Sequence, residues 1–293
     1  MNRREFIGLG AAALAGCAAP KAVEMGKGRV RPGLRLGMAG FTYKKRGVDS
    51  MLKEMERLEI RYLCVKDFHL PYTATDVEIR EFVRKCADSG VTPYGVGPVP
   101  SKTIDQIRMA FDFAKRLGAG VIVGSPYKVG KSAEGKDLLR NRELCEQISP
   151  LCDEYDIRFA IHNHGPDQPL CYPTGEVVCE FVKDLSPRMG MCLDIGHDYR
   201  SGSDPAVCIR RFRDRLFDLH LKDIRPHAGD SKADAMILGR GVLDLPAVVK
   251  ALCDVGYGGC CSIEYETNFD DNFGDIAESV GYFKALVRLA EKC

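Results

Sequence analysis

The feature that most constrains this chain is an eightfold alternation of short apolar runs with longer amphipathic stretches, which begins at residue 34. Alternation of this kind is typical of repeated βα units on a parallel sheet, because each helix covers one face of the sheet. The expected strands are residues 34–40, 60–67, 91–97, 119–125, 157–164, 189–196, 216–223 and 260–266.

Two of the intervening stretches show helical periodicity clearly. Residues 49–58 carry apolar side chains at helical spacing, and the stretch that opens at Asp244 places four of them on one face. Asp244 suits an N-cap and Pro246 suits the first turn. We therefore predict an α/β chain folded as a single (β/α)8 TIM barrel. An open doubly wound sheet would usually have fewer strands and a G-x-G-x-x-G turn, which the sequence lacks.

The first sixteen residues have the composition of an export signal. Arg3 and Arg4 precede a run of small apolar residues that is too short to span a bilayer, and paired arginines are typical of the twin-arginine route. The sequence Leu14-Ala15-Gly16-Cys17 resembles a lipobox, which predicts lipidation at Cys17. The alternative is a cytoplasmic protein with an apolar amino terminus.

These signals divide the chain into a signal peptide (1–16), a tether (17–33) and the barrel (34–293). We therefore expect an exported lipoprotein, anchored to the membrane through Cys17 on the periplasmic side of a bacterial cell envelope. No linker or low-complexity tract interrupts the barrel segment, which favours a single domain.

Charge and cysteine content exclude some classes of function. The chain has 42 Lys and Arg and 41 Asp and Glu, and subtracting Arg3, Arg4 and Glu5 of the signal leaves both counts at 40. That balance argues against a nucleic acid partner. The twelve cysteines after Cys17 show no C-x-x-C spacing, so we expect mostly buried thiols, with a disulfide at Cys171 left open.

The histidines gather at one end of the predicted barrel. Five of the six lie at or just past the carboxyl end of an expected strand, and the sixth lies in the loop after the seventh strand. They are His69, His162, His164, His197, His220 and, in that loop, His227. Active sites of (β/α)8 barrels are built from the loops at this end, so the set indicates a functional rim.

Strand alternation refines this prediction at residues 216–223. One face carries Phe217, Leu219 and Leu221, and the other carries Asp218, His220 and Lys222. We expect the apolar face to meet the helices. The polar face then points into the barrel, where three ionisable groups are costly unless they pair or bind a metal or a ligand.

Four consecutive strands each place one metal-ligating side chain at the same end. They are His162, Asp194, His220 and Glu264. Two imidazoles and two carboxylates suit Mn²⁺ first, with Co²⁺, Fe²⁺ or Zn²⁺ as alternatives, and suit Mg²⁺ less. A buried network of ion pairs without metal is the competing interpretation.

Four motifs carry a family resemblance. Asp194-Ile195-Gly196-His197, His220-Leu221-Lys222-Asp223, the segment from Gly239 to Leu245 (GRGVLDL) and the segment from Ser262 to Glu266 (SIEYE) resemble the sugar phosphate isomerase/epimerase superfamily of xylose isomerase-like barrels. The resemblance covers nearly everything after residue 33. It implies that the relatives of this chain include keto-sugar epimerases, hydroxypyruvate isomerase, inosose dehydratase and endonuclease IV enzymes.

One departure bears on the mechanism that the resemblance implies. The epimerases carry a ligand glutamate on the fifth strand, whereas this chain has His162 in His162-Asn163-His164. Proton transfer between two metal-bound glutamates is therefore in doubt. Members similar to inosose dehydratase match this histidine-rich segment better, which keeps elimination or hydration open.

The resulting hypothesis is a metal-dependent isomerase or epimerase that acts on a keto-sugar or cyclitol through an enediolate. Glu264 is the expected base, with His197 and Lys66 as further catalytic candidates. Substrate-binding candidates are His69, His164, Lys222 and Arg240. The alternatives are an inosose dehydratase-like lyase and a non-catalytic sugar-binding lipoprotein; a repair nuclease is disfavoured by the charge balance and the export signal.

Overall fold

A computed structural model describes residues 33–126, 135–166, 172–225 and 235–290 of the chain. Its centre is a closed barrel of eight parallel strands in the order β1-β10-β7-β6-β5-β4-β3-β2. The strands are β1 (Arg35–Ala39), β2 (Tyr62–Val65), β3 (Thr92–Val99), β4 (Val121–Gly124), β5 (Arg158–His162), β6 (Met189–Asp194), β7 (Leu216–Leu221) and β10 (Cys260–Ile263). All eight predicted strands are confirmed, and so is the TIM barrel.

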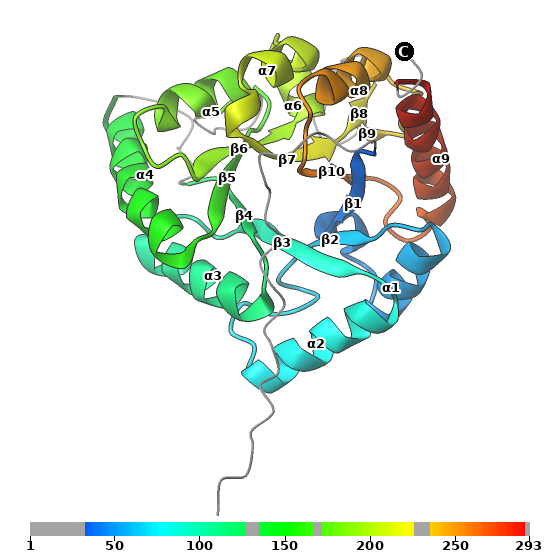
Figure 1. The fold of residues 1–293 in the computed structure, drawn as a ribbon, viewed down its shortest axis with the longest axis horizontal. Helices are drawn as coiled ribbons and strands as arrows, with labels where there is room; N and C mark the ends of the chain where they lie inside the picture. Colours follow the sequence, from blue (N-terminus) through cyan, green and yellow to red (C-terminus); the bar gives the residue numbers. More distant parts are fainter. Residues whose placement is uncertain (1–32, 127–134, 167–171, 226–234, 291–293) are drawn as a thin grey trace, which may run out of the picture.

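Helices surround this barrel as an outer ring (Figure 1). The larger ones are α1 (Val48–Arg57), α2 (Asp76–Asp88), α3 (Ile104–Leu117), α4 (Gly135–Tyr155), α5 (Gly175–Val182), α8 (Leu245–Asp254) and α9 (Phe273–Ala290). The connections add η1 (Gly40–Tyr43), α6 (Ile195–Arg200), α7 (Pro205–Arg211), η2 (Arg213–Arg215) and the small antiparallel pair β8 (Asp223–Ile224) and β9 (Ala235–Met236). The simple alternation is thus elaborated after β6 and after β7.

Local sequence explains where several helices begin and end. Thr75 caps α2 through a capping box with Glu78. Asp244 caps α8 by accepting a hydrogen bond from the Ala247 amide at 3.0 Å, which confirms the predicted start of that helix. Gly118 ends α3 with a φ of 79°, a left-handed conformation that glycine adopts without strain.

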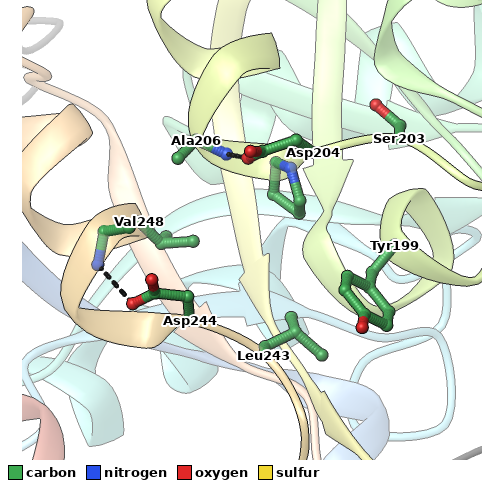
Figure 2. A pocket seen from close by; sticks show the side chains of 9 residues that line it. Tyr199, Ser203, Asp204, Ala206, Leu243, Asp244 and Val248 are labelled. Atoms are coloured by element: carbon green, nitrogen blue, oxygen red, sulfur yellow. Dashed lines mark hydrogen bonds between the residues drawn. The ribbon is translucent and has the colours of Figure 1, made fainter.

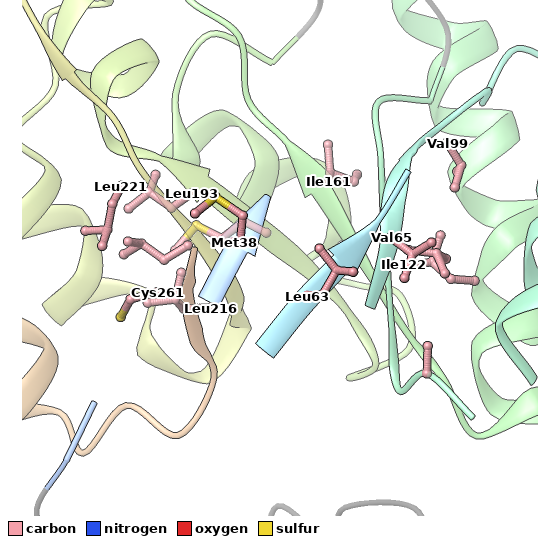
Figure 3. Close-up of a cluster of buried hydrophobic side chains, with 14 of the residues drawn as sticks. Met38, Leu63, Val65, Val99, Ile122, Ile161, Leu193, Leu216, Leu221 and Cys261 are labelled. Atoms are coloured by element: carbon pink, nitrogen blue, oxygen red, sulfur yellow. The ribbon is translucent and has the colours of Figure 1, made fainter. Parts of the chain in front are cut away.

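Most of the apolar core lies between the barrel and its helices. Figure 3 shows part of it, with Met38, Leu63, Ile122, Ile161, Leu193 and Leu221 contributed by six different strands. A smaller cluster, which we call the inner cluster, consists of Cys64, Val121, Val123, Ala160, Cys192 and Phe217. These layers leave the polar side chains of the strands facing the barrel axis at its carboxyl end.

Phe217 departs from the prediction that it faces the helices with Leu219 and Leu221. It belongs to the inner cluster instead, whereas Leu219 and Leu221 pack in the main core. The cause is a register shift between Met191 and Cys192 of β6 where that strand pairs with β7. A bulge of this kind inserts one residue and changes the face onto which a side chain points.

Several expectations about the termini and cysteines fall partly outside the described residues. The predicted signal peptide, Cys17 and all of the tether except Gly33 are among the residues not described, as are Cys171 and His227. Of the ten cysteines in the described part, all are free thiols and all but Cys253 are buried, as predicted. Within that part, no helix is both long and apolar enough to cross a membrane.

Candidate metal centre

Four side chains from neighbouring strands converge at the carboxyl end of the barrel. His162 and Asp194 are the last residues of β5 and β6, His220 lies on β7, and Glu264 directly follows β10. Their ligand atoms all lie within 4.8 Å of one another. The residues are only 2%, 0%, 0% and 4% exposed in that order, so the fold brings the four predicted ligands into one buried cluster.

Strand register accounts for this convergence. Asp194 of β6 pairs with His220 of β7, and His220 also pairs with Ser262 of β10. The Glu264 amide then donates to the Leu221 carbonyl at 3.1 Å, which extends β10 by one residue toward the rim. Because parallel strands keep equivalent residues level, the ligands occupy one layer of the barrel.

Some polar atoms of these side chains are buried without any partner. Both ring nitrogens of His162 and Nε2 of His220 lack a hydrogen bond, whereas Oδ2 of Asp194 and Oε2 of Glu264 are held by ion pairs, one of them the 3.1 Å contact of that Glu264 oxygen with Nδ1 of His220. Nε2 of His162 lies 3.6 Å from that Asp194 oxygen and 3.8 Å from that Glu264 oxygen. Buried polar atoms without partners are costly, and this mixed nitrogen and oxygen set fits a divalent cation.

Electrostatics keep the two carboxylates ionised. Burial would raise the pKa of Asp194, but Lys222 holds that pKa well below its usual range. The pKa of Glu264 is also lowered, because the effects of His220 and Lys222 outweigh the increase that burial causes. Burial lowers the pKa of His220, but the Glu264 carboxylate outweighs this and raises it to about 9. Binding of a metal would release the proton of His220.

Lys222 lies at the centre of the same cluster. Its Nζ forms ion pairs of 2.9 Å with Oδ2 of Asp194 and of 2.9 Å with Oε2 of Glu264. A third carboxylate, Glu266, is 2.7 Å away. Although burial disfavours a charged amine, these carboxylates raise the pKa of Lys222 well above its usual value. The sequence placed Lys222 on the inward face but gave no indication of its partners.

His197 and His164 complete a histidine-rich wall. The ring of His197 is 5.1 Å from that of His164, which in turn is 4.4 Å from that of His162. Nη2 of Arg200 lies 2.8 Å from Nδ1 of His197. Because a guanidinium only donates, Nδ1 must accept, and the ring proton belongs on Nε2. Burial lowers the pKa of His197 to about 3, so the ring is a neutral donor.

Asn163 positions Asp194 and was missed by the sequence analysis. Its amide oxygen accepts from the Asp194 backbone amide at 2.8 Å, and its amide nitrogen donates to the Asp194 carbonyl at 3.2 Å. Asp194 in turn caps α6 by accepting from the His197 amide at 2.8 Å. The available signal in the sequence was an asparagine between two histidines at the end of an expected strand.

Asp223 explains why two of the sequence motifs occur together. Its carboxylate accepts from the backbone amides of Gly239, Gly241 and Leu243 at 2.9, 2.9 and 3.3 Å. A Cβ on Gly241 would lie 2.1 Å from that carboxylate. The glycine-rich segment is therefore built around Asp223, next to Lys222.

A second polar layer lies beneath the ligands and was also missed. The Tyr94 hydroxyl is 2.9 Å from both carboxylate oxygens of Asp218 and 2.7 Å from the Ser262 hydroxyl. Burial raises the pKa of Asp218 to about 6. The inward direction of Asp218 was predictable from strand alternation, but its partner on β3 is 124 positions away in the chain.

Three predicted site residues have partners elsewhere. Nζ of Lys66 donates to the Pro98 carbonyl at 2.8 Å, and Nε2 of His69 lies 3.1 Å from the Tyr43 carbonyl oxygen. Arg240 forms a bidentate pair with Glu278 of α9 at 2.6 and 2.7 Å, on the outer surface. The structure does not bring these three into the ligand cluster. Their proposed catalytic or substrate-binding roles stay predictions.

A pocket of about 160 Å³ lies between the beginnings of α7 and α8 (Figure 2). Asp204 and Asp244 line it, but each is engaged as a helix cap, with Asp204 accepting from the Ala206 amide at 2.8 Å. None of the four ligand residues lines this pocket. It is therefore separate from the candidate metal centre.

Comparisons with known proteins agree with this architecture. The family model of the xylose isomerase-like TIM barrel matches residues 45–286. Inosose dehydratase of Klebsiella pneumoniae is 25% identical over 194 aligned residues that cover 56% of this chain and 64% of the relative. Fructoselysine 3-epimerase of Escherichia coli O157:H7 is 27% identical over 179 residues, covering 57% and 60%.

Among solved structures, an uncharacterized protein from Parabacteroides distasonis is 25% identical to this chain. The match has a TM-score of 0.64 and covers 86% of this chain and 98% of the other. The chain spans less than two thirds of the length of the two curated relatives. The comparisons thus bear on the family and the fold.

Proposed function

This chain belongs to the family of xylose isomerase-like TIM barrels, and from that premise we propose that it is a divalent-metal-dependent isomerase or epimerase of keto-sugars or related polyols. The observation that carries the proposal is the set of His162, Asp194, His220 and Glu264, whose buried ligand atoms lie within 4.8 Å of one another, with both ring nitrogens of His162 and Nε2 of His220 lacking hydrogen bonds. The proposed cation is Mn²⁺, with Co²⁺, Fe²⁺ and Zn²⁺ as alternatives. It would polarise a substrate carbonyl and favour the enediolate form.

In this proposal Glu264 is the general base. Its lowered pKa keeps it ionised, and it lies on the same rim as the other ligands. It takes the proton from the carbon next to the carbonyl, so that the C–H electron pair forms the double bond of the enediolate. Return of the proton by Glu264 to the neighbouring carbon gives isomerisation, whereas epimerisation needs a second donor, such as a water molecule, that delivers a proton to the opposite face of the same carbon.

His197 is proposed to bind substrate rather than to carry the proton. The Arg200 guanidinium occupies Nδ1, so the ring proton lies on Nε2, which is 3.8 Å from the Asp194 carboxylate and 3.5 Å from the ammonium of Lys222, itself only a donor. A neutral imidazole in this position donates a hydrogen bond to a substrate oxygen. His164, between His162 and His197, would line the same space.

Elimination of water is the second candidate, and His162 is the observation that favours it. The epimerases of this superfamily are expected to carry a glutamate at this strand position, whereas here Glu264 is the only glutamate in the ligand set. With a single carboxylate base, the enediolate can expel a β-hydroxyl group. The similarity to inosose dehydratase supports this route.

Solvent exchange separates these possibilities. Metal-loaded protein is incubated in D₂O with a panel of keto-sugars and cyclitols, and products are followed by NMR and mass spectrometry, with Glu264→Gln as control. Deuterium incorporation without loss of water supports isomerisation or epimerisation, and loss of one water supports the lyase. Ligand binding without exchange would contradict both and favour a sugar-binding protein.

We also propose that the enzyme is exported and anchored through Cys17, where it meets unphosphorylated sugars. The support is the order of the paired arginines, the apolar run and the lipobox-like sequence in residues 1–17. Fractionation of cells that express the full chain tests this. The wild type should partition with membranes and Cys17→Ala should not; recovery of both in the cytoplasm would contradict it.

A further inference from the structure

The contacts of Lys222 concern the same oxygens that would ligate a metal. Its ammonium is 2.9 Å from Oδ2 of Asp194 and 2.9 Å from Oε2 of Glu264. These are the atoms that face Nε2 of His162 at 3.6 and 3.8 Å. A cation bound by His162, Asp194 and Glu264 would therefore lie next to a buried positive charge, and the two charges repel.

Glu266 gives this ammonium a second place. Its Oε2 is 2.7 Å from Nζ of Lys222, and its side chain is 35% exposed, whereas the ligand carboxylates are almost fully buried. Glu266 does not belong to the group of four possible ligands. A lysine side chain has four flexible methylenes, so Nζ can leave Asp194 and Glu264 while it stays paired with Glu266.

We propose that Lys222 is an internal competitor of the metal: its ammonium neutralises Asp194 and Glu264 before the cation binds and withdraws to Glu266 when it does. Lys222 and Glu266 then set the metal affinity without being ligands. The ammonium also prevents the buried carboxylates from repelling one another in the metal-free protein. This inference rests on the proposed metal-dependent function.

Two substitutions should change metal affinity in opposite directions. Lys222→Met removes the competing charge, so Mn²⁺ should bind about tenfold more tightly or better. Glu266→Gln removes the alternative partner and leaves the ammonium on the ligands, so Mn²⁺ should bind about threefold to tenfold more weakly. Lys66→Met is the matched control, because Lys66 pairs with the Pro98 carbonyl and Asp67 instead, and it should change the affinity less than twofold.

In the experiment, metal-free full-length protein is titrated with Mn²⁺. Binding is measured by calorimetry and by the EPR signal of free Mn²⁺. The double variant Lys222→Met/Glu266→Gln completes a cycle. Because Glu266 acts through Lys222, its substitution should have no effect on affinity when Lys222 is already absent. Glu266→Gln alone keeps the test valid if Lys222→Met does not fold.

The outcomes separate this inference from the proposed function. Opposite shifts in the two single variants, or Mn²⁺ binding by Lys222→Met alone, support competition. Wild-type binding that Lys222→Met leaves equal or weakens would overturn the inference while the metal-dependent function stands. Absence of Mn²⁺, Co²⁺ and Zn²⁺ binding in every folded variant would overturn both.

Discussion

The two halves of the barrel rim use similar residues differently. At the ends of β5, β6 and β7, and just after β10, four ligand-type side chains face one another, and three buried ring nitrogens of His162 and His220 among them lack hydrogen bonds. At the end of β2, Lys66 donates to the Pro98 carbonyl and His69 contacts the Tyr43 carbonyl, so that only one ring nitrogen of His69 lacks a partner. A position at a strand end is therefore weak evidence, and converging unsatisfied atoms are stronger evidence.

The sharpest way to break this comparison is Glu264→Gln. The substitution keeps the shape of the side chain but removes the proposed base and one ligand charge, so turnover should fall about 10³-fold, equivalent to about 4 kcal/mol of transition-state stabilisation. Steady-state kinetics with the best substrate from the exchange screen measure this. A decrease of less than tenfold would show that the β5–β10 side of the rim does not carry the chemistry.

Asp223→Ala tests whether that side also needs a rigid frame. The variant leaves the amides of Gly239, Gly241 and Leu243 without their acceptor, and water can replace only part of the loss. We expect a loss of about 3 kcal/mol in the free energy of unfolding, measured by urea denaturation. Asp244→Ala, which removes one helix cap, should cost only about 1 kcal/mol; equal effects would contradict the special role of Asp223.

Asp198→Asn tests the cost of burying carboxylates on this side. Burial raises the pKa of Asp198 to about 6, although its carboxylate accepts from the Gly175 amide at 2.9 Å. With the folded pKa above the unfolded value, the protein loses stability as pH rises from about 4 to 6, by up to about 3 kcal/mol. The asparagine variant should therefore be more stable by about 2 kcal/mol at pH 7 and no more stable below about pH 4.

Thermal unfolding of both proteins across this pH range gives the comparison. A constant difference at all pH values would instead assign the effect to altered packing around Asp198.

His69→Ala probes the other half of the rim. It removes the contact with the Tyr43 carbonyl and the ring contact with Phe68 at 4.6 Å. We expect a loss of about 1 kcal/mol in stability, measured by denaturation, with Mn²⁺ affinity unchanged within about twofold. Loss of metal binding in this folded variant would place the site elsewhere and erase the difference between the two halves.

The sequence allowed the barrel and the convergence of the four candidate ligands to be predicted because both depend on local periodicity. Alternation along β7 places His220 inward, and the strand ends place His162, Asp194 and Glu264 at the same level. The rest depends on contacts between distant segments. Three features leave no periodic signal in the sequence. They are the bulge that turns Phe217 inward, the hydrogen bond between Tyr94 and Asp218, and the ion pair that holds Arg240 at Glu278.

Lys222 shows the same limit within the site itself. Its inward direction follows from strand alternation, but its ion-pair partners depend on the register between β6, β7 and β10. The sequence suggested contact with substrate, and the structure adds direct contacts with Asp194, Glu264 and Glu266.

The central claim is that His162, Asp194, His220 and Glu264 bind a divalent cation, and metal content tests it most directly. Elemental analysis of purified protein, loaded with Mn²⁺ and freed of excess, compares the wild type with His162→Ala and Glu264→Ala. Our account predicts near-stoichiometric metal in the wild type and its loss in both folded variants. A wild type that binds none of Mn²⁺, Co²⁺, Fe²⁺ and Zn²⁺, or variants that retain metal fully, would contradict it.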